Sequence, residues 1–583
     1  MFRTKRAPFL AAALLTVLPA AAQEAPQEQE ETFFESIDVQ VVNVEVFVTD
    51  RQGKRVTGLS RDDFEILEDG KPVEISNFYA VDGGRSELPR ETETAAAPAP
   101  AVPRPEPSGE IPPEQRLHLA IVVDDLTLAA QSRNRLLQSL EKEVLPRLRP
   151  DDFAMVAVVG GSSVRIVQGL TADPAQIRTA LEEATRSAPQ GTARMMDKRE
   201  MLSRIDNVGL QMPGENQGAD FNAGVVEQLY HDLQSYAAQR GMEARASLNA
   251  LESFVDSLSG LPGRKAVLYM GGGLSTRPGE ALFQAWQSKF GTLARVRGVN
   301  ISTSSFDGQR EDLSKNFHDL VEHANANRVT FYTLGALEEL SGVGADTRTS
   351  DSWGVTLENL EKMNLQQSLE RIASGTGGLA GVDLIDPRSL FDRMRQDFDS
   401  YYSLGYVPVR RRDGKNRRIE VRIRGQQNLQ VRTREGRRDQ SNRERMTART
   451  LAALMLDPGG NALELAADFV GETKQKDEYL VDVLVKFPLA KLVLLPKERF
   501  HEGKVTLFVG ARDSRGRMSP IQEIDVPIRV PNDQLLTALG QTAAYKATLR
   551  LRGDAHTVAV SIRDELGNAD SAIAVPYTPG GKG

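Results

Sequence analysis

The chain has 583 residues, more than a single hydrophobic core organises, so several domains are expected. Charged residues make up 26% and hydrophobic residues 40%, as in soluble globular proteins, and the net charge of −8 argues against nucleic acid as a general partner. The absence of cysteine excludes disulfides, thiolate metal sites and cysteine nucleophiles.

The N-terminus has the three parts of a secretory signal peptide. Three of the first six residues are basic, residues 9–18 form a short apolar run, and three alanines precede Gln23. The run is too short to span a bilayer, and no later stretch is long and apolar enough to do so. We therefore predict a signal peptide over residues 1–22 and an exported protein, periplasmic or extracellular, with an uncleaved N-terminal anchor as the alternative.

Residues 36–82 are predicted to form a small β module. Residues 41–48 largely alternate between apolar and polar side chains, which is typical of a strand. The segments 50–54 and 68–71 each contain an Asp and a Gly, which is typical of a turn. Residues 83–115 are rich in Pro, Ala and Glu without an apolar period. They are predicted to be a linker.

From residue 116 the pattern changes to alternating strands and helices, which predicts a doubly wound, mostly parallel sheet with helices on both faces. The predicted strands are 117–124, 153–159, 163–168, 265–270 and 329–334, and the predicted helices are 130–146, 173–187, 222–259, 279–296, 312–326, 360–373 and 387–400. The Gly160-Gly161-Ser162 turn predicts one antiparallel strand. Residues 192–222 lack a clear period and are interpreted as an insertion, with partly helical structure as an option.

The last third of the chain is β-rich. Residues 401–407, 419–423 and 429–432 either extend the sheet or start a new hairpin, and the α/β domain is placed at residues 116–435. Residues 436–449 are charged and are interpreted as a linker, with a solvated helix as the alternative. Short alternating runs over residues 450–578, with Asp-x-x-Gly turns, predict a β-sandwich-like domain.

The chain resembles von Willebrand factor type A-related proteins of the subgroup abundant in Acidobacteria. Residues 44–70 resemble the leading β segment of that subgroup, and residues 117–125 resemble the first strand of its A-type domain. Residues 258–268 resemble the approach to its fourth strand, and residues 402–408 resemble its closing segment. The resemblance implies a von Willebrand factor A-like fold that presents its strand-end loops to a protein partner.

The family usually holds a divalent metal with Asp-x-Ser-x-Ser after strand one, a loop Thr, and an Asp after strand four. Hydroxyl and carboxylate oxygens suit Mg²⁺ and leave a position for a partner's carboxylate. Aligning Asp124 with the first Asp places Leu126 and Leu128 at the two Ser positions, and aligning Asp125 keeps Thr127 but places Ala129 at the second. Gly272 stands where the later acid is expected. The remnant ligands are Asp124, Asp125, Thr127 and Thr192, so we expect a degenerate site without metal, and the alternative is a Mg²⁺-dependent adhesin. If no metal binds, Asp124 and Asp125 cap the following helix.

Signals for catalysis are weak. The segment from His318 to His323 spaces its histidines five residues apart, which places them on different faces of a helix. Neither a nucleophile elbow nor a phosphate-binding loop occurs. We therefore expect no enzyme, no catalytic or cofactor-binding residues and no cofactor, and interpret the chain as an exported protein-binding, scaffold or adhesion protein. The alternative is a cell-envelope enzyme or an enzyme-accessory subunit.

Overall fold

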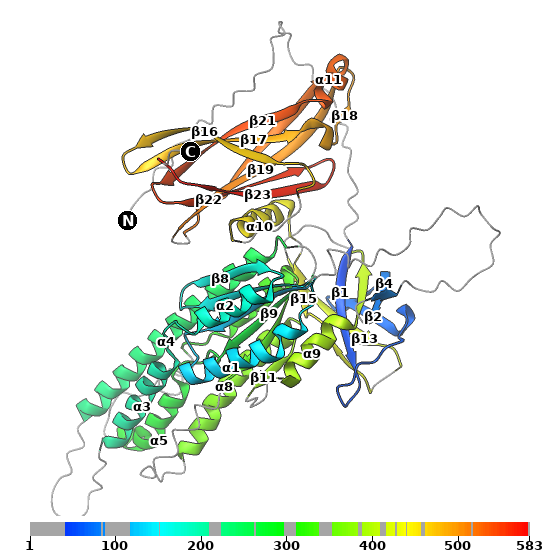
Figure 1. Ribbon diagram of the computed structural model, residues 1–583. Helices are drawn as coiled ribbons and strands as arrows, with labels where there is room; N and C mark the ends of the chain where they lie inside the picture. Colours follow the sequence, from blue (N-terminus) through cyan, green and yellow to red (C-terminus); the bar gives the residue numbers. More distant parts are fainter. Residues whose placement is uncertain are drawn as a thin grey trace, which may run out of the picture. The chain divides into compact units, whose positions relative to one another are not determined.

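The protein is described by a computed structural model, which divides into two compact units, residues 40–441 and the described residues from 442 onward. Figure 1 labels helices and strands of both units. The described residues are 41–82, 85–87, 117–150, 152–208, 223–261, 264–296, 310–336, 353–382, 388–408, 415–425, 428–438, 440–455, 461–514 and 517–580. The predicted signal peptide and almost all of the predicted linker lie outside them, as does much of the predicted insertion.

A six-stranded sheet forms the centre of the first unit. Its order is β11-β10-β9-β6-β7-β8. The bounds are Leu117–Asp124 (β6), Phe153–Val159 (β7), Val164–Thr171 (β8), Arg264–Gly271 (β9), Val329–Gly335 (β10) and Ala380–Val382 (β11). Every neighbouring pair is parallel except β7 and β8, which are joined by the predicted glycine turn. The predicted α/β character and the antiparallel strand are therefore confirmed. All eight residues of β6 are buried, because both faces of the sheet are covered.

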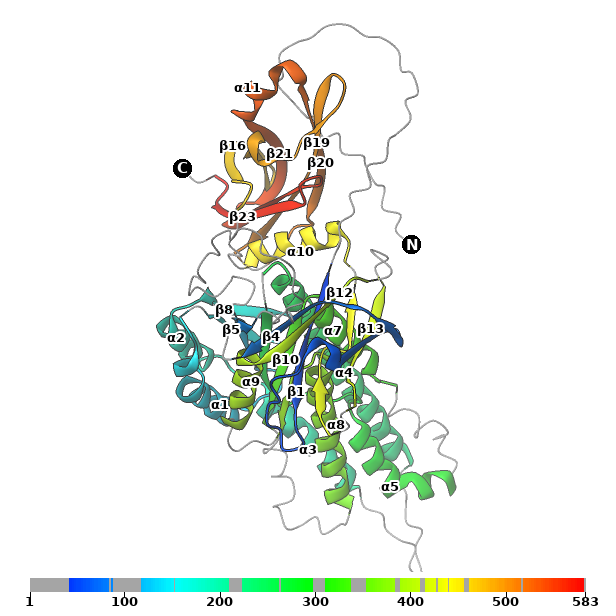
Figure 2. The same cartoon turned by 90° about the vertical axis from the view of Figure 1, so that its right-hand side faces the viewer.

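Helices cover both faces of this sheet (Figure 2). One face packs against α1 (Ala130–Glu143), α2 (Pro174–Ala184) and α9 (Arg388–Asp399), which share a core with β6, β7, β9 and β10. On the other side lie α4 (Ala223–Leu258), α7 (Ser314–Ala326) and α8 (Trp353–Gly375). The sequence placed the start of α8 seven residues too late. Gly241 does not interrupt α4, and a Cβ there would lie 2.5 Å from a carboxylate oxygen of Glu311.

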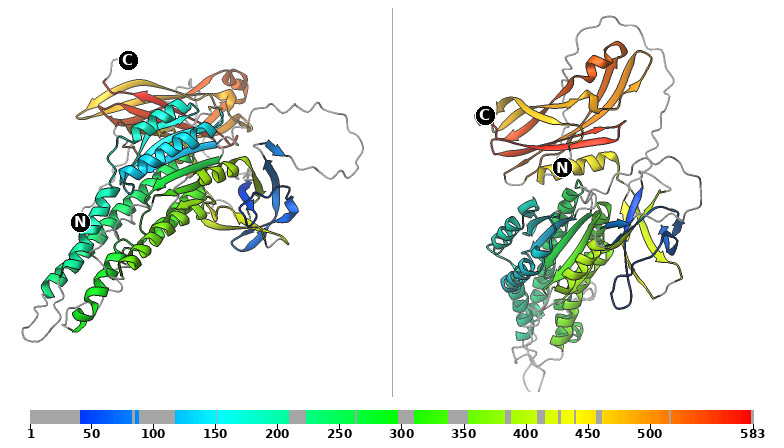
Figure 3. Two further views of the ribbon diagram at one scale, coloured as in Figure 1. Left: turned by 60° about the horizontal axis from the view of Figure 1, so that its bottom comes forward. Right: turned by 45° about the vertical axis from the view of Figure 1, so that its right-hand side comes forward.

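Three helices build a second, separate core beyond the sheet. α3 (Gly191–Asn207), α4 and α5 (Glu280–Val296) pack around Trp286, and the long helices project past the sheet in Figure 3. The first part of the predicted insertion is therefore the helix α3, whose buried side chains include Met201 and Ile205.

The small β module is built from two distant parts of the chain. One sheet has the order β14-β1-β12-β4-β5 and the other β15-β13-β2-β3. The bounds are Val42–Thr49 (β1), Phe64–Glu68 (β2), Lys71–Val73 (β3), Ile75–Asp82 (β4), Arg85–Glu87 (β5), Tyr401–Tyr406 (β12), Asn416–Ile423 (β13), Gln430–Arg432 (β14) and Gly436–Arg438 (β15).

This arrangement corrects the predicted boundary at residue 435. The described strands within residues 401–435, which are β12, β13 and β14, belong to the β module and do not extend the central sheet. β12 lies between β1 and β4, because Leu404 and Tyr406 complete the core that Val44 and Val46 begin. The module is also tied to the α/β domain through the buried Asp397, which accepts hydrogen bonds from Arg55 at 2.6 Å and Arg432 at 2.7 Å.

The described part of the second unit is a β-sandwich with two α-helices, α10 (Asn442–Met455) and the short α11 (Leu535–Leu539). Its sheets are β16-β17-β21 and β18-β19-β22-β23, with β20 paired to β19. The bounds are Ala466–Gln475 (β16), Glu478–Pro488 (β17), Leu495–Pro496 (β18), Phe500–Asp513 (β19), Gln522–Pro531 (β20), Thr542–Arg552 (β21), His556–Asp564 (β22) and Ala569–Tyr577 (β23). Alternate residues of both sheets point into a shared core, as the periodicity predicted.

The segment 436–449 was predicted to be a charged linker or, alternatively, a solvated helix, and a helix forms in its second part. Its beginning is β15, and Asn442–Met455 form α10. Thr450 of α10 donates a hydrogen bond to Ser561 of β22 at 2.9 Å, and Leu454 packs near Ala559, so the helix has one buried face despite its charge. None of the described helices combines the length and apolar character needed to cross a bilayer.

Candidate functional site

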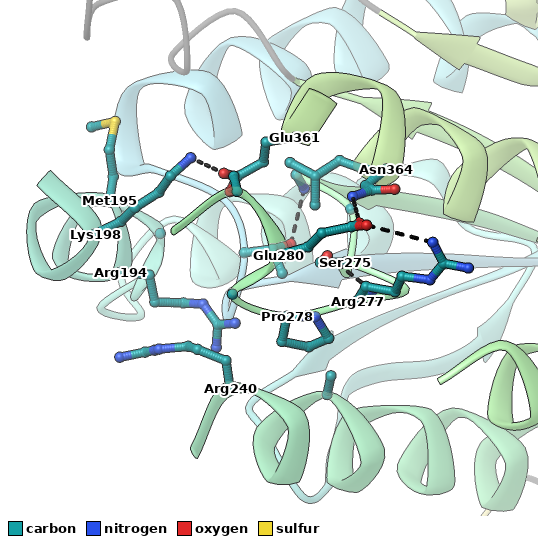
Figure 4. Close-up of a pocket in the computed structure, with 18 of the residues that line it drawn as sticks. Arg194, Met195, Lys198, Arg240, Ser275, Arg277, Pro278, Glu280, Glu361 and Asn364 are labelled. Carbon is teal, nitrogen blue, oxygen red and sulfur yellow. Dashed lines mark hydrogen bonds and ion pairs between the residues drawn. The ribbon is translucent and has the colours of Figure 1, made fainter. Parts of the chain in front are cut away.

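A pocket of about 140 Å³ opens at the carboxyl ends of the central parallel strands. Thr127 follows β6, Gly272 and Gly273 follow β9, and Ala336 follows β10, and all four residues line it. Further lining residues come from α3, α4, α5 and α8 (Figure 4). Open doubly wound sheets bind ligands at this edge, so the pocket is the candidate site.

Asp124, the last residue of β6, is completely buried beneath this edge. Its Oδ2 accepts hydrogen bonds from the hydroxyls of Thr127, at 2.8 Å, and Tyr269, and its Oδ1 accepts from the backbone N–H of Leu126 at 2.9 Å. Burial raises the pKa of the Asp124 carboxyl, and these hydrogen bonds together with the nearby Arg194 charge act in the opposite direction. Both carboxylate oxygens are therefore occupied by donors of the protein itself.

Asp125 has hydrogen-bond partners different from those of Asp124. Its carboxylate accepts from Arg133 of α1 at 3.1 Å and from the hydroxyl of Ser187, and its backbone carbonyl accepts from the N–H of Gln190 at 2.7 Å. Asp125 thus joins β6, α1 and the segment that leads into α3. This is a structural role that differs from both sequence alternatives, metal ligand and helix cap.

The two predicted threonines have different surroundings. The Thr127 hydroxyl donates to Asp124 and accepts from the backbone N–H of Gly272 at 2.9 Å, so it joins the ends of β6 and β9. Thr192 is exposed on the first turn of α3, while the neighbouring Gly191 packs against Leu128, where a Cβ would lie 2.4 Å from the backbone carbon. The structure therefore brings Asp124, Thr127 and Gly272 together and leaves Thr192 outside.

The residues present do not fit the divalent metal that the family resemblance implies. A Mg²⁺ ion needs several oxygen ligands with free lone pairs. Here Leu126 and Leu128 are buried in the core, and a metal at Asp124 Oδ2 would compete with the hydrogen bonds from the Tyr269 and Thr127 hydroxyls. Within the described part of the chain, no three His, Asp or Glu side chains lie close enough together to hold a metal.

The pocket is instead lined by basic side chains that the sequence analysis missed. Arg194 and Lys198 come from α3, Arg240 from α4, and Arg277 from the loop before α5. The four-residue spacing of Arg194 and Lys198 places them on one face of a helix and was a usable signal. That signal was lost because residues 192–222 were interpreted as an aperiodic insertion. Arg194 is close enough to Asp124 to oppose part of the rise that burial causes in the pKa of its carboxyl.

Carboxylates hold these cations in place. Glu243 accepts hydrogen bonds from both Arg194 and Arg240, the latter at 2.9 Å, and Lys198 pairs with Glu361 of α8. Arg277 pairs with Glu280 at 3.5 Å, whose other oxygen accepts from Asn364 at 3.0 Å (Figure 4). Burial lowers the pKa of the Arg194 guanidinium, and Glu243 counteracts that effect. The result is a polar pocket with its charged side chains held in place, next to the fully buried carboxylate of Asp124.

Comparisons with known proteins give matches to solved structures alone, all of low sequence identity and low TM-score. No protein-family model matches the chain. No curated protein matches it either. Among solved structures, the SpRpn10 VWA domain is 13% identical, and the alignment covers 48% of this chain and 95% of that chain at a TM-score of 0.17. The TFIIH p34 N-terminal domain is 10% identical over 48% of this chain and 96% of that chain, with a TM-score of 0.16. A β-glucuronidase from Bacteroides uniformis is 9% identical over 33% of this chain and 20% of that chain, with a TM-score of 0.13.

Proposed function

We propose that the protein is an exported, non-catalytic binding or scaffold protein whose A-type domain presents its strand-end loops to a protein partner without a metal. The hydrogen bonding of Asp124 is the observation that carries this proposal. A metal-dependent domain needs this carboxylate open to the ion, whereas here Tyr269, Thr127 and the Leu126 amide occupy both oxygens. The site therefore lies at the usual strand-end edge of the sheet, but its carboxylate is bound by protein donors and not by a metal ion.

The pocket lining supports binding rather than catalysis. A general base must come within hydrogen-bond reach of its substrate, directly or through one water. Asp124 has no exposed surface, and the two carboxylates of the lining, Glu280 and Glu361, are paired with Arg277 and Lys198. Ser275 offers a hydroxyl, but the described lining places no base in the role that activates a serine nucleophile.

Export rests on the N-terminal segment alone. Its basic start, short apolar run and alanine-rich end match a signal peptide. The predicted leader lies outside the described residues. Detection of the mature chain, beginning near Gln23, in the periplasm or medium would test this part of the proposal.

Metal independence is tested by calorimetric titration of the full-length protein with Mg²⁺ and Mn²⁺. We expect only heats of dilution. Saturable binding that Asp124→Ala abolishes would contradict the proposal and favour the metal-dependent adhesin. A broad hydrolase screen tests the enzyme alternative, where turnover that survives repurification would refute a non-catalytic role.

Partner binding is tested by capture from envelope extract of the producing cells, with and without EDTA. Arg277→Glu changes a 40% exposed side chain at the pocket, and Arg178→Glu changes a 51% exposed side chain on α2 and serves as the matched control. We expect a captured protein that Arg277→Glu loses, Arg178→Glu keeps and EDTA does not release. Equal capture by both variants would place the binding surface elsewhere.

A further inference from the structure

A small cavity lies at the amino ends of β9 and β10, where the β module meets the α/β domain. We infer that the amine of Lys265, which lines this cavity, is a carbamylation site: it takes up CO₂ and becomes a carbamate anion among arginine side chains. This inference is independent of the proposed function, because the cavity lies at the opposite edge of the sheet from the strand-end pocket.

The cavity has a volume of about 20 Å³ and a basic lining. Arg264 and Lys265 begin β9, Arg328 precedes β10, and Arg434 lies between β14 and β15. Among the described lining residues, Glu45 of β1 is the only acidic one. One water molecule needs roughly 10–15 Å³ of such space, so the cavity accommodates a group of a few atoms and excludes a larger ligand.

The positive charges of this lining exceed the negative charge. Glu45 forms an ion pair with Arg328. The buried guanidinium of Arg434 donates hydrogen bonds to two backbone carbonyls, at 2.7 and 3.3 Å, and that of Arg264 donates to a third at 3.2 Å. Within the described part of the chain, neither Arg264 nor Arg434 has a carboxylate in an ion pair. A buried charge without a counterion is costly, so an additional anion is favoured here.

The Lys265 amine is buried without an ion-pair partner among the described residues. The residue is 6% exposed, and its Nζ donates a hydrogen bond to the backbone carbonyl of Leu261 at 3.1 Å. Lysine is almost never buried this deeply unless it is paired. Burial lowers the pKa of Lys265 to about 7, and the charges of Arg328 and Arg434 add to this lowering, whereas Glu45 opposes it. The unprotonated amine, which carries the reactive lone pair, is therefore well populated at neutral pH.

These features match the requirements of a reaction with CO₂. The nitrogen lone pair of Lys265 forms a bond to the carbon of CO₂, one C=O electron pair moves onto oxygen, and the nitrogen releases a proton to solvent. The amine thereby becomes an anion whose oxygens accept charge-assisted hydrogen bonds, and it offsets one of the positive charges of the lining. Because CO₂ is small and uncharged, it enters a buried site without the desolvation cost of an ion.

The test uses the full-length protein equilibrated with ¹³C-labelled bicarbonate, about one pH unit above the pKa of Lys265, where the amine is largely unprotonated. ¹³C NMR detects a protein-bound carbamate carbon directly. In parallel, triethyloxonium converts a carbamate into its stable ethyl ester, and peptide mass spectrometry locates the labelled lysine. We expect one carbamate resonance and one labelled lysine, Lys265, and we expect loss of both signals when CO₂ is removed before trapping.

Two substitutions and an internal control then locate the modification. Lys265→Met should abolish both signals, and Arg434→Met should reduce the adduct at Lys265, because the carbamate loses a neighbouring cation. Lys198 is also partly buried, at 14% exposed, but it is paired with Glu361 and should stay unlabelled. Comparing wild-type protein with and without CO₂ needs no substitution, so the test stands even if a variant misfolds.

Three results would overturn the inference: no adduct at Lys265 in the folded wild-type protein, an adduct spread over exposed lysines, or a carbamate resonance that persists in Lys265→Met. The thermal unfolding midpoint gives a second readout. It should rise with bicarbonate in the wild type and not with chloride at the same pH and ionic strength. An equal rise with chloride, without an adduct, would reject the carbamate in favour of a bound inorganic anion.

Discussion

The hydrogen bond from Tyr269 to Asp124 is expected to be a major contributor to stability. Tyr269→Phe removes the hydroxyl and keeps the ring, so apolar burial hardly changes. The carboxylate of Asp124 remains buried and keeps only Thr127 and the Leu126 amide as donors. Loss of a hydrogen bond to a charged group costs about 1.5–3 kcal/mol, and we expect Tyr269→Phe to lower the free energy of unfolding by that amount.

Urea denaturation followed by tryptophan emission measures this effect in residues 40–441, the compact unit that contains Asp124 and Tyr269. Both tryptophans of the chain, Trp286 and Trp353, lie in helices of residues 40–441, so their emission reports the unfolding of that unit. Tyr79→Phe removes a hydroxyl from a side chain that is 38% exposed and is the matched control. A midpoint for Tyr269→Phe equal to that of Tyr79→Phe would refute the role assigned to this hydrogen bond.

The pH dependence provides a second check with a definite sign. Burial raises the folded-state pKa of Asp124 above its unfolded-state pKa. Between these two pKa values the folded state binds more protons than the unfolded state, so stability falls as pH rises from the lower to the higher value. The Tyr269 hydroxyl favours the charged form and limits the loss. The difference between wild type and Tyr269→Phe should therefore be largest at neutral pH and shrink in acid. A difference that grows in acid would contradict the argument.

Two further predictions concern the ends of β9. Gly272→Ala would place a Cβ 2.7 Å from the carbonyl oxygen of Thr127, so we expect a loss of about 1–3 kcal/mol in urea denaturation, and Gly272→Asp should not create Mg²⁺ binding in calorimetry. Burial lowers the pKa of Lys265 to about 7, from 10.5, so the unfolded chain binds more protons between these values and wild-type stability should rise with pH across that window. Lys265→Met should remove that rise, and parallel pH profiles for the two proteins would refute it.

The sequence predicted those parts of the fold that depend on local pattern. β6 and β7 were located to the residue, because a short continuous apolar run is typical of a strand buried on both faces. The antiparallel strand β8 followed from Gly160 and Gly161, and Gly161 has a positive φ of 82°. These signals act over a few residues and need no knowledge of the rest of the chain.

The chemistry of the site could not be predicted in the same way. The sequence showed which metal ligands of the resembled family are absent here, but not which side chains surround Asp124. Tyr269 is 145 residues from Asp124, and period-two alternation in a strand buried on both faces does not reveal which side chain meets which carboxylate. The positions of Arg194 and Arg240 depend on how α3 packs against α4, which is a tertiary property.

The return of β12 to the N-terminal strands predicts how the chain can be divided. A fragment spanning residues 115–435, the domain suggested by the sequence, would leave β12 without β1 and β4 and would remove Arg55 from the buried Asp397. A buried charge that loses a partner is strongly destabilising, and bare strand edges promote aggregation. We expect this fragment to be insoluble or to bind the dye ANS, whereas residues 40–441 should unfold in urea at the midpoint of the full chain. A soluble 115–435 fragment with that same midpoint would show that the β module is dispensable for folding of the α/β domain.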